Sequence, residues 1–278
     1  MDGGLMPDRI TCVEMQHLNI VAPDFEATVS HFRDLFGAQF VLDLPNTNWH
    51  AGLLYLGGVL IELFAPNDFF LNSRYGAHYI GVEYEVGELD SVRRNLTERD
   101  IGLVRDIGVA IHTDPADTHG VAFEFYAGNF HRDGVVEWLE PLRSAEYWRE
   151  EHPMGLAGLK RYSVATARHA AAVDFYRDTF DVCAVYDEER PHIGARVTGL
   201  QLADTVVELI SPLGPGVIED HLCRHGEGIR SIVLAVADIA KACGHLARRG
   251  VVVGPGDHPD SVALAPEHNR GLLMELAS

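Results

Sequence analysis

The sequence predicts an α+β protein made of four similar βαβββ units, arranged as two tandem domains. The first observation behind this prediction is an internal repeat: HFRDLFGAQF at 31–40 matches FYRDTFDVCA at 175–184, with an offset of 144 residues. The second is that apolar, β-rich segments and one amphipathic segment alternate in the same order four times. Together they indicate that both halves of the chain share one fold.

The N-terminal half contains two of these units. The first unit is expected to hold a strand at 16–22, a helix at 25–36, and strands near 38–44, 50–56 and 58–64. In the helix, Phe32, Leu35 and Phe36 belong to one apolar stripe and Gly37 is a plausible stop, while Gly57-Gly58 suits a hairpin turn. The second unit is expected to hold a strand at 78–86, a helix at 88–99, and strands near 102–106, 109–113 and 120–126.

The C-terminal half repeats this order with a slowly drifting offset. The matches pair 17–24 with 161–168, 59–66 with 206–212, 77–86 with 229–238, and 119–125 with 270–276. Loop insertions explain such a drift. We therefore expect one domain at 1–135, a partly helical connector at 136–156, and a second domain at 157–278.

Composition limits the classes of function. The chain has 278 residues, 47% of them hydrophobic, which is enough for one large core or two domains. The net charge of -19 argues against a nucleic-acid partner, since phosphate binding needs a basic face. No apolar run approaches the roughly 20 residues of a membrane span, and the start of the chain lacks the features of a signal peptide. No pair of the four cysteines has C-x-x-C spacing, so reduced cysteines and a cytoplasmic location are expected.

The paired βαβββ units resemble the vicinal oxygen chelate superfamily. This superfamily includes glyoxalase I, methylmalonyl-CoA epimerase, extradiol dioxygenases, and fosfomycin or bleomycin resistance proteins. LIELFAP at 60–66 is similar to a run in the epimerases, and the segment 114–124 is similar to the last hairpin of many members. The resemblance covers about 14–127 and 157–277, and 207–239 resembles methylmalonyl-CoA epimerase most closely. It implies that the two units of each half curl into a cup-shaped mixed sheet.

The resemblance also implies a metal site in the N-terminal cup. In that superfamily, the first and last strands of each unit supply the ligands, and these places hold His17, Glu62, His78 and Glu124. Imidazole and carboxylate ligands suit one divalent ion of Zn, Fe, Mn, Co or Ni. The alternative is that the histidines are ordinary half-buried strand residues, but unpaired carboxylates in apolar strands are costly.

The matching places of the C-terminal half hold Arg161, Glu208, Arg230 and Glu275. A guanidinium group stays protonated and cannot bind a metal. We therefore expect a degenerate domain without metal, in which the two arginines pair with the two glutamates.

For activity, the resemblance implies that the metal polarises substrate oxygens and stabilises a neighbouring anion. Glu62 is like the glyoxalase and epimerase sites, which favours a lyase, isomerase or epimerase acting on a small carbonyl substrate through an enolate. Glu62 or Glu124 is then a ligand, or a base that leaves the metal. The alternatives are an Fe(II) extradiol-type dioxygenase acting on an aromatic substrate, and a non-catalytic resistance protein that binds a small molecule.

Several other side chains are candidates near the cup. His50 is a candidate acid or base, and Tyr126 shares the face of Glu124 because it follows two residues later on the strand. Further candidates are Trp49, Tyr55, Tyr79 and His112. The sequence leaves the oligomeric state open, and a homodimer is compatible with it.

Overall fold

The computed structural model describes residues 8–46, 50–66, 76–129 and 137–278. The N-terminal half follows the expected order closely. Its elements are β1 (Cys12–Val21), α1 (Phe25–Phe36), β2 (Gln39–Pro45), β3 (His50–Leu56), β4 (Val59–Phe64), β5 (His78–Val86), α2 (Leu89–Glu98), β6 (Leu103–Asp106), β7 (Ala110–Thr113), the 3-10 turn η1 (Pro115–Asp117) and β8 (Ala122–Ala127).

The C-terminal half repeats these elements and has a helix between its two units, at a place where residues 67–75 of the N-terminal half lie outside the described ranges. After the π-helical turn η2 (Tyr147–Glu151) come β9 (Leu156–Ala165), α3 (His169–Thr179), β10 (Val182–Arg190), β11 (Ala195–Leu202), β12 (Thr205–Pro212), α4 (Val217–His225), β13 (Gly228–Val236), α5 (Ile239–Arg248), β14 (Val253–Pro255), β15 (Ser261–Leu264), η3 (Pro266–His268) and β16 (Leu273–Ala277). The helix between the two units is α4.

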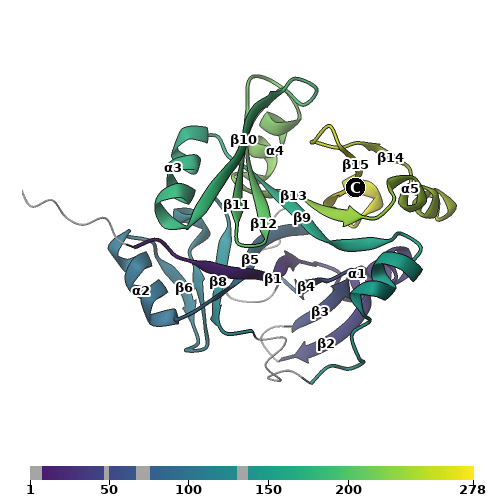
Figure 1. Ribbon diagram of the computed structural model, residues 1–278, viewed down its shortest axis with the longest axis horizontal. Helices are drawn as coiled ribbons and strands as arrows, with labels where there is room; N and C mark the ends of the chain where they lie inside the picture. Colours follow the sequence, from purple (N-terminus) through teal and green to yellow (C-terminus); the bar gives the residue numbers. More distant parts are fainter. Residues whose placement is uncertain (1–7, 47–49, 67–75, 130–136) are drawn as a thin grey trace, which may run out of the picture.

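Two eight-stranded mixed sheets result, and they confirm the expected fold class. Their strand orders are β2-β3-β4-β1-β5-β8-β7-β6 and β10-β11-β12-β9-β13-β16-β15-β14. In Figure 1 the N-terminal sheet fills the lower part of the molecule and the C-terminal sheet the upper part. Because β1 pairs with both β4 and β5, the two units of one half share one sheet. All residues of a given cup therefore come from the same half.

Local sequence explains the helix that covers the first unit. The Asp24 carboxylate accepts the backbone N–H of Ala27 at the start of α1, and Gly37 ends the helix with a left-handed φ of 65°. The expected stripe of Phe32, Leu35 and Phe36 is buried. The Gly57-Gly58 hairpin is also confirmed, since Leu56 pairs directly with Val59.

The two halves are packed into one continuous apolar core. At its centre the hydroxyls of Tyr84 and Tyr162 are 3.1 Å apart. On the right of Figure 1, His245 of α5 donates to the Leu35 carbonyl of α1. On the left, Arg99 after α2 donates to the Asp178 carbonyl of α3. The halves therefore meet through helix pairs, α1 with α5 and α2 with α3, and through direct contact of strands β5 and β13. No helix within the described ranges is long and apolar enough to span a membrane.

The connector packs against the rest of the protein at His152, whose side chain is buried. Its ring lies 4.7 Å from the Trp148 ring, and Nδ1 accepts the backbone N–H of Met154. Burial, reinforced by the charge of His245, lowers the pKa of His152 to about 4. The imidazole is therefore neutral in the folded protein at neutral pH.

We expect this histidine to make stability acid-sensitive. Between pH 4 and 6.5 the unfolded chain binds the proton more readily than the folded chain. The contribution of His152 is therefore complete above pH 6.5 and is lost as the pH falls towards 4, at up to about 1.4 kcal/mol per pH unit. Urea unfolding at several pH values measures this. The stability advantage of wild type over His152→Gln should shrink from pH 7 to pH 4, and a constant advantage would refute the assignment.

Candidate metal centre

One face of the N-terminal sheet carries a row of polar side chains across five neighbouring strands, β4, β1, β5, β8 and β7. The strand register places them side by side, because His17 pairs with Glu83, Asn19 with Glu62, and Glu124 with both Glu83 and His112. We call this group the His17 cluster; it consists of His17, Asn19, Glu62, Glu83, His112 and Glu124. A single half of the chain supplies every member.

His17 lies at the centre of the cluster, where three carboxylates surround its ring. Its Nε2 is 3.2 Å from an oxygen of Glu62 and 3.5 Å from an oxygen of Glu124. Its Nδ1 is 3.7 Å from Glu83. The three side chains therefore meet around one imidazole.

Glu124 is the second centre, because both of its oxygens are engaged. Nε2 of His112 lies 3.0 Å from Oε1, and the Asn19 amide donates to Oε2 at 3.1 Å. The Glu124 side chain is only 10% exposed. A buried carboxylate with these partners has a fixed orientation, which is what precise ligand geometry requires.

The charges of the cluster shift its pKa values in opposite directions. Burial opposes protonation of His17, but the Glu83 charge and the hydrogen bonds to Glu124 and Glu62 outweigh burial and raise its pKa well above the ordinary value. Burial also opposes ionisation of Glu124, but the charge and hydrogen bond of His112 outweigh it and lower its pKa. Burial is the leading cause that raises the pKa of Glu83 to about 8. The cluster therefore attracts positive charge.

The donor atoms of the cluster fit a divalent metal ion. One ligand atom each of His17, Glu83 and Glu124 lie within 4.8 Å of one another, and all three residues are buried. Among the described residues, Glu83 Oε1 and Asn19 Oδ1 have no hydrogen-bond partner. A buried carboxylate oxygen without a donor is costly, and a bound cation removes that cost. His17, Glu83 and Glu124, with Glu62 beside them, are therefore the residues that could hold an ion.

The structure does not bring His78 to this cluster, so that expectation is corrected. His78 pairs with Val21, four residues along β1 from His17, which corresponds to about 13 Å. The register slips by one residue between Asn19 and Ile20, at a β-bulge. Beyond the bulge, Gly81 lies beside Asn19, where an added Cβ would come within 1.9 Å of the Ala122 carbonyl oxygen. No side chain of β5 fits there, and Glu83 is the β5 residue that reaches His17.

His50 is also separate from the cluster. It belongs to the set of alternate β3 residues that face α1, and its ring stacks on Phe25 at 3.9 Å while its Nε2 lies 2.6 Å from Asp43. Leu53, whose side chain points to the opposite face of β3 from His50, pairs with Glu62. His50 thus lies on the other face of the sheet and is not a candidate acid or base for this site.

The remaining candidates divide into two groups. Tyr126 pairs with Glu85 and Ala110 and shares the face of Glu124, so it lies at the border of the cluster. The ring of Tyr55 packs on Trp148, and the Tyr79 hydroxyl donates to the Leu273 carbonyl between the halves. Trp49 lies outside the described residues.

Glu83 and Asn19 are the cluster members that were not predicted from the sequence. The first strand of the first unit carries His17, and the histidine at the corresponding place of the second unit is His78. The signal for Glu83 was its position in GVEYEV, where Glu83 and Glu85 alternate with Val82 and Tyr84. Alternation puts a charged face opposite an apolar face, and Val82 and Tyr84 are fully buried in the core. The pattern predicts the face but not the register.

The C-terminal cup has an ionic network at the corresponding place. By register, Arg161 takes the place of His17, Glu208 that of Glu62, and Glu275 that of Glu124. Arg161 is 3.7 Å from Glu208, as expected, but its closer partner is Asp260 at 2.5 Å. The main partner of Glu208 is Arg190, also at 2.5 Å.

The expected pairing of Arg230 with Glu275 is wrong. The same bulge shifts the C-terminal register, so Ser231 stands beside Ser163 and Arg230 points elsewhere, to Asp257 at 2.7 Å. Glu275 instead accepts hydrogen bonds from Ser231, Ser261 and the backbone N–H of Asp257. Arg161 and Arg190 thus occupy this cup, whereas the N-terminal cup has His17 and an oxygen of Glu83 without a hydrogen-bond partner.

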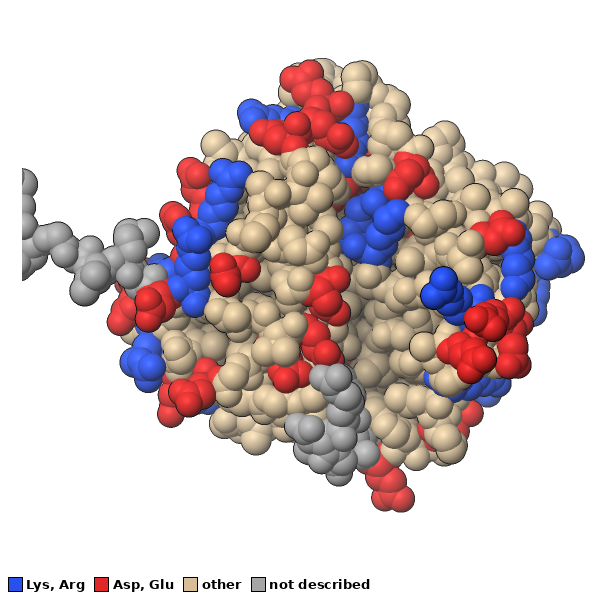
Figure 2. All heavy atoms as spheres, viewed as in Figure 1, with Lys and Arg blue, Asp and Glu red and all other residues tan. Residues whose placement is uncertain are grey.

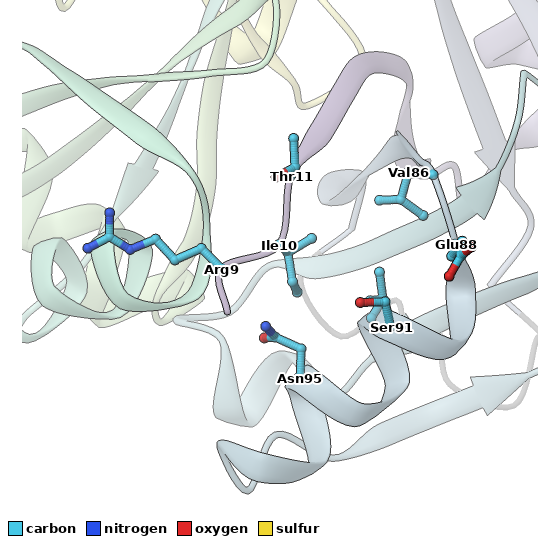
Figure 3. Close-up of a pocket in the computed structure, with 9 residues that line it drawn as sticks. Arg9, Ile10, Thr11, Val86, Glu88, Ser91 and Asn95 are labelled. Carbon is cyan, nitrogen blue, oxygen red and sulfur yellow. The ribbon is translucent and has the colours of Figure 1, made fainter. Parts of the chain in front are cut away.

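Two surface features lie apart from these cups. A hollow of about 250 Å³ opens between the segment before β1 and the start of α2. It is lined by Arg9, Thr11, Glu88, Ser91 and Asn95 among others, and contains no member of the His17 cluster (Figure 3). On the face shown in Figure 2, acidic and basic side chains are interspersed over an otherwise uncharged surface. A nucleic-acid site would instead need basic residues gathered on one face.

Comparisons with known proteins agree with this architecture. Residues 158–266 match the family model of the Glyoxalase/Bleomycin resistance protein/Dioxygenase superfamily. No curated protein matches the sequence. A mutant of 4-hydroxymandelate synthase from Streptomyces coelicolor has a similar structure, with a TM-score of 0.75 and 15% identity over 95% of this chain and 92% of that chain.

Two further solved structures are similar. A xylose isomerase-like TIM barrel/4-hydroxyphenylpyruvate dioxygenase fusion protein aligns with 99% of this chain and 50% of its own, at a TM-score of 0.70 and 14% identity. Methylmalonyl-CoA epimerase from Mycobacterium tuberculosis is 26% identical over 44% of this chain and 87% of its own, with a TM-score of 0.41. At such low identity the first two similarities show a shared fold only. The C-terminal half thus matches the Glyoxalase/Bleomycin resistance protein/Dioxygenase superfamily model over residues 158–266, and both halves together share the fold of 4-hydroxymandelate synthase.

Proposed function

We propose that this chain is a divalent-metal enzyme of the lyase, isomerase or epimerase type, which moves a proton on a small carbonyl substrate. The observation that carries the proposal is the number of donors in the His17 cluster. His17, Glu83 and Glu124 already provide three ligand atoms within reach of one ion, and Glu62 adds a further carboxylate 3.2 Å from His17. One carboxylate therefore remains available for proton transfer.

A bound divalent ion would act as a Lewis acid that withdraws electron density from a substrate oxygen. The carboxylate-rich donor set, with one imidazole, suits Mn, Fe or Zn better than a soft thiolate metal. His17, Glu83 and Glu124 would hold it. Asn19 and His112 would orient Glu124 through the hydrogen bonds already present.

Glu62 is the proposed base. Its side chain is 16% exposed, compared with 3% for Glu83 and 10% for Glu124, so a substrate reaches it most easily. In the proposed step, the C–H bond next to the substrate carbonyl breaks, its proton passes to a Glu62 oxygen, and its electron pair delocalises onto the carbonyl oxygen. Return of the proton to another face or another carbon gives epimerisation or isomerisation, and loss of a neighbouring group gives a lyase reaction.

A second candidate is an Fe(II) dioxygenase, and His112 is the observation in its favour. His17 and His112 lie on either side of Glu124, at 3.5 and 3.0 Å. Two histidines and one carboxylate are the donors of non-haem Fe(II) oxygenases. The names of the similar structures, 4-hydroxymandelate synthase and the 4-hydroxyphenylpyruvate dioxygenase fusion protein, agree with this candidate. Against it, His112 does not join the group of donors that lie within 4.8 Å of one another.

A deuterium-exchange assay distinguishes the two candidates. The protein, loaded with Mn²⁺, Fe²⁺ or Zn²⁺ without oxygen, is incubated in D₂O with small 2-oxo acids, acyl thioesters and hemithioacetals. We expect metal-dependent deuterium incorporation next to the carbonyl, detected by NMR, and its loss by about 100-fold or more in Glu62→Gln. Glu85→Gln, on β5 two strands away in the same sheet, is the matched control and should retain exchange. Oxygen uptake with an aromatic substrate and Fe²⁺, without exchange, would favour the dioxygenase instead.

A further inference from the structure

A second cavity lies between the two halves, away from the His17 cluster. It has a volume of about 350 Å³ and is lined by the start of β5, by α4, by the start of β13 and by the turn before β16. This volume is in the range of small-molecule sites. His78, which the His17 cluster did not use, is one of its lining residues.

The polar lining of this cavity is basic, although the chain as a whole is strongly acidic. His78, His221, Arg224, His225 and Arg230 line it, and Asp220 is the single carboxylate among its lining residues. A net charge of -19 makes such a concentration of cationic and imidazole groups unexpected. A local concentration of positively charged groups favours the binding of anionic ligands.

The two guanidinium groups are placed to bind a further partner. Arg230 holds Asp257 through Nε and Nη2, which fixes the group while Nη1 donates to no described residue. Arg224 forms no ion pair with any described carboxylate, even though Asp220 precedes it by one helical turn. One arginine is therefore oriented and the other is available.

Burial and the neighbouring positive charges lower the pKa values of two histidines of α4, His221 and His225. The rings of His221 and His225 lie 4.8 Å apart, one turn apart on α4. Burial first, then the charges of Arg230 and His225, lower the pKa of His221 to about 3. Burial first, then Arg224 and Arg230, lower that of His225. Neutral imidazole N–H groups can donate to an anion without adding charge of their own.

Two histidines one helical turn apart, such as His221 and His225, can also bind a metal ion, but the neighbouring charges argue against a cation here. Two arginines line the same cavity, and a divalent ion would be repelled by both. No third ligand joins His221 and His225, because His17, Glu83 and Glu124 are the only group of three such donors among the described residues. The charge therefore favours an anion.

From this geometry we infer that the cavity between the halves binds a small organic anion, with its charged group at Arg224 and Arg230 and its apolar part against Val217, Ile229 and Leu273. A carboxylate and a phosphate monoester share this chemistry, because both accept paired hydrogen bonds from guanidinium. The inference is independent of the metal centre, since no residue of the His17 cluster lines the cavity.

Isothermal titration calorimetry of the full-length protein tests this inference with n-butyl phosphate, hexanoate and neutral 1-hexanol. We expect saturable binding of one or both anions, and weaker binding of 1-hexanol. The tighter of the two anions identifies the class. Arg224→Ala should weaken anion binding about tenfold, because it removes a charge-assisted hydrogen bond.

Two control variants and one competing ligand make the result decisive. Arg196→Ala removes an exposed arginine outside the cavity and should leave the affinity unchanged. Glu124→Gln should also leave it unchanged, which separates this site from the proposed metal centre. Equal anion affinity in Arg224→Ala and wild type, or equal affinity for 1-hexanol and hexanoate, would overturn the inference. So would Zn²⁺ binding that is lost in His221→Ala when neither anion binds.

Discussion

Glu124→Gln is expected to reduce the affinity for divalent metal by about 100-fold or more. Loss of a residue that only orients a ligand costs roughly 10–100-fold, so loss of a ligand oxygen should reach or exceed that range. Glu124 lies at the centre of the cluster, where it contacts His17, His112 and Asn19. Glutamine preserves its size but removes the negative charge. The measurement is calorimetric titration of the metal-free protein with Mn²⁺ and Zn²⁺, together with the metal content of the purified variant.

The chain provides a matched control for this experiment. Glu275 holds the corresponding position in the other sheet, and its oxygens are already bonded to Ser231, Ser261 and a backbone N–H. Glu275→Gln should therefore leave the metal stoichiometry unchanged. Equal metal binding by Glu124→Gln and wild type would refute the metal centre, and loss of metal in both variants would place it elsewhere.

Arg190→Met is expected to destabilise the fold by about 3–5 kcal/mol. Arg190 and Glu208 are both about 1% exposed, and their side chains are 2.5 Å apart. Removal of the arginine leaves Glu208 buried with the weaker Arg161 contact at 3.7 Å and a hydrogen bond from Tyr186. A buried charge that loses its main ion-pair partner has a cost of this size. Guanidinium chloride unfolding measures it.

A double variant separates burial of a charge from loss of packing. Arg190→Met combined with Glu208→Leu removes both charges, and should recover much of the lost stability because an apolar pair of similar volume often replaces a buried ion pair. Arg196→Met breaks an exposed pair with Asp187 and should cost less than about 1 kcal/mol. If Arg190→Met costs no more than Arg196→Met, the network is not a structural substitute for the metal.

The fold could be predicted from sequence because its signals are local. Alternation of apolar and polar residues predicted the strands, and the apolar stripe of Phe32, Leu35 and Phe36 predicted α1. The internal repeat predicted that the second half has the same fold as the first. Three members of the cluster, His17, Glu62 and Glu124, were expected from the resemblance to the vicinal oxygen chelate superfamily. The strands of His17 and Glu62 are adjacent, and β5 separates the His17 strand from that of Glu124.

The register of β5 could not be predicted in this way. Shifting a strand by one residue turns every side chain to the other face, and the bulge between Asn19 and Ile20 makes such a shift part-way along the pair. It moves His78 out of the cluster and brings Glu83 to His17. The corresponding shift in the C-terminal sheet turns Arg230 towards Asp257 instead of Glu275.

The sequence by itself thus determined the repeated units and the two sheets, and its resemblance to a known superfamily led to the hypothesis of a metal centre at His17, Glu62, His78 and Glu124. Only the tertiary structure decided that Glu83 completes the cluster, that His78 instead lines a cavity between the halves, and that Arg190 is the main partner of Glu208. The physical reason is the separation in sequence of the residues that determine each feature. Alternation and capping depend on neighbours in the chain, whereas register, close approach and ion pairing depend on contacts between strands and halves far apart in sequence.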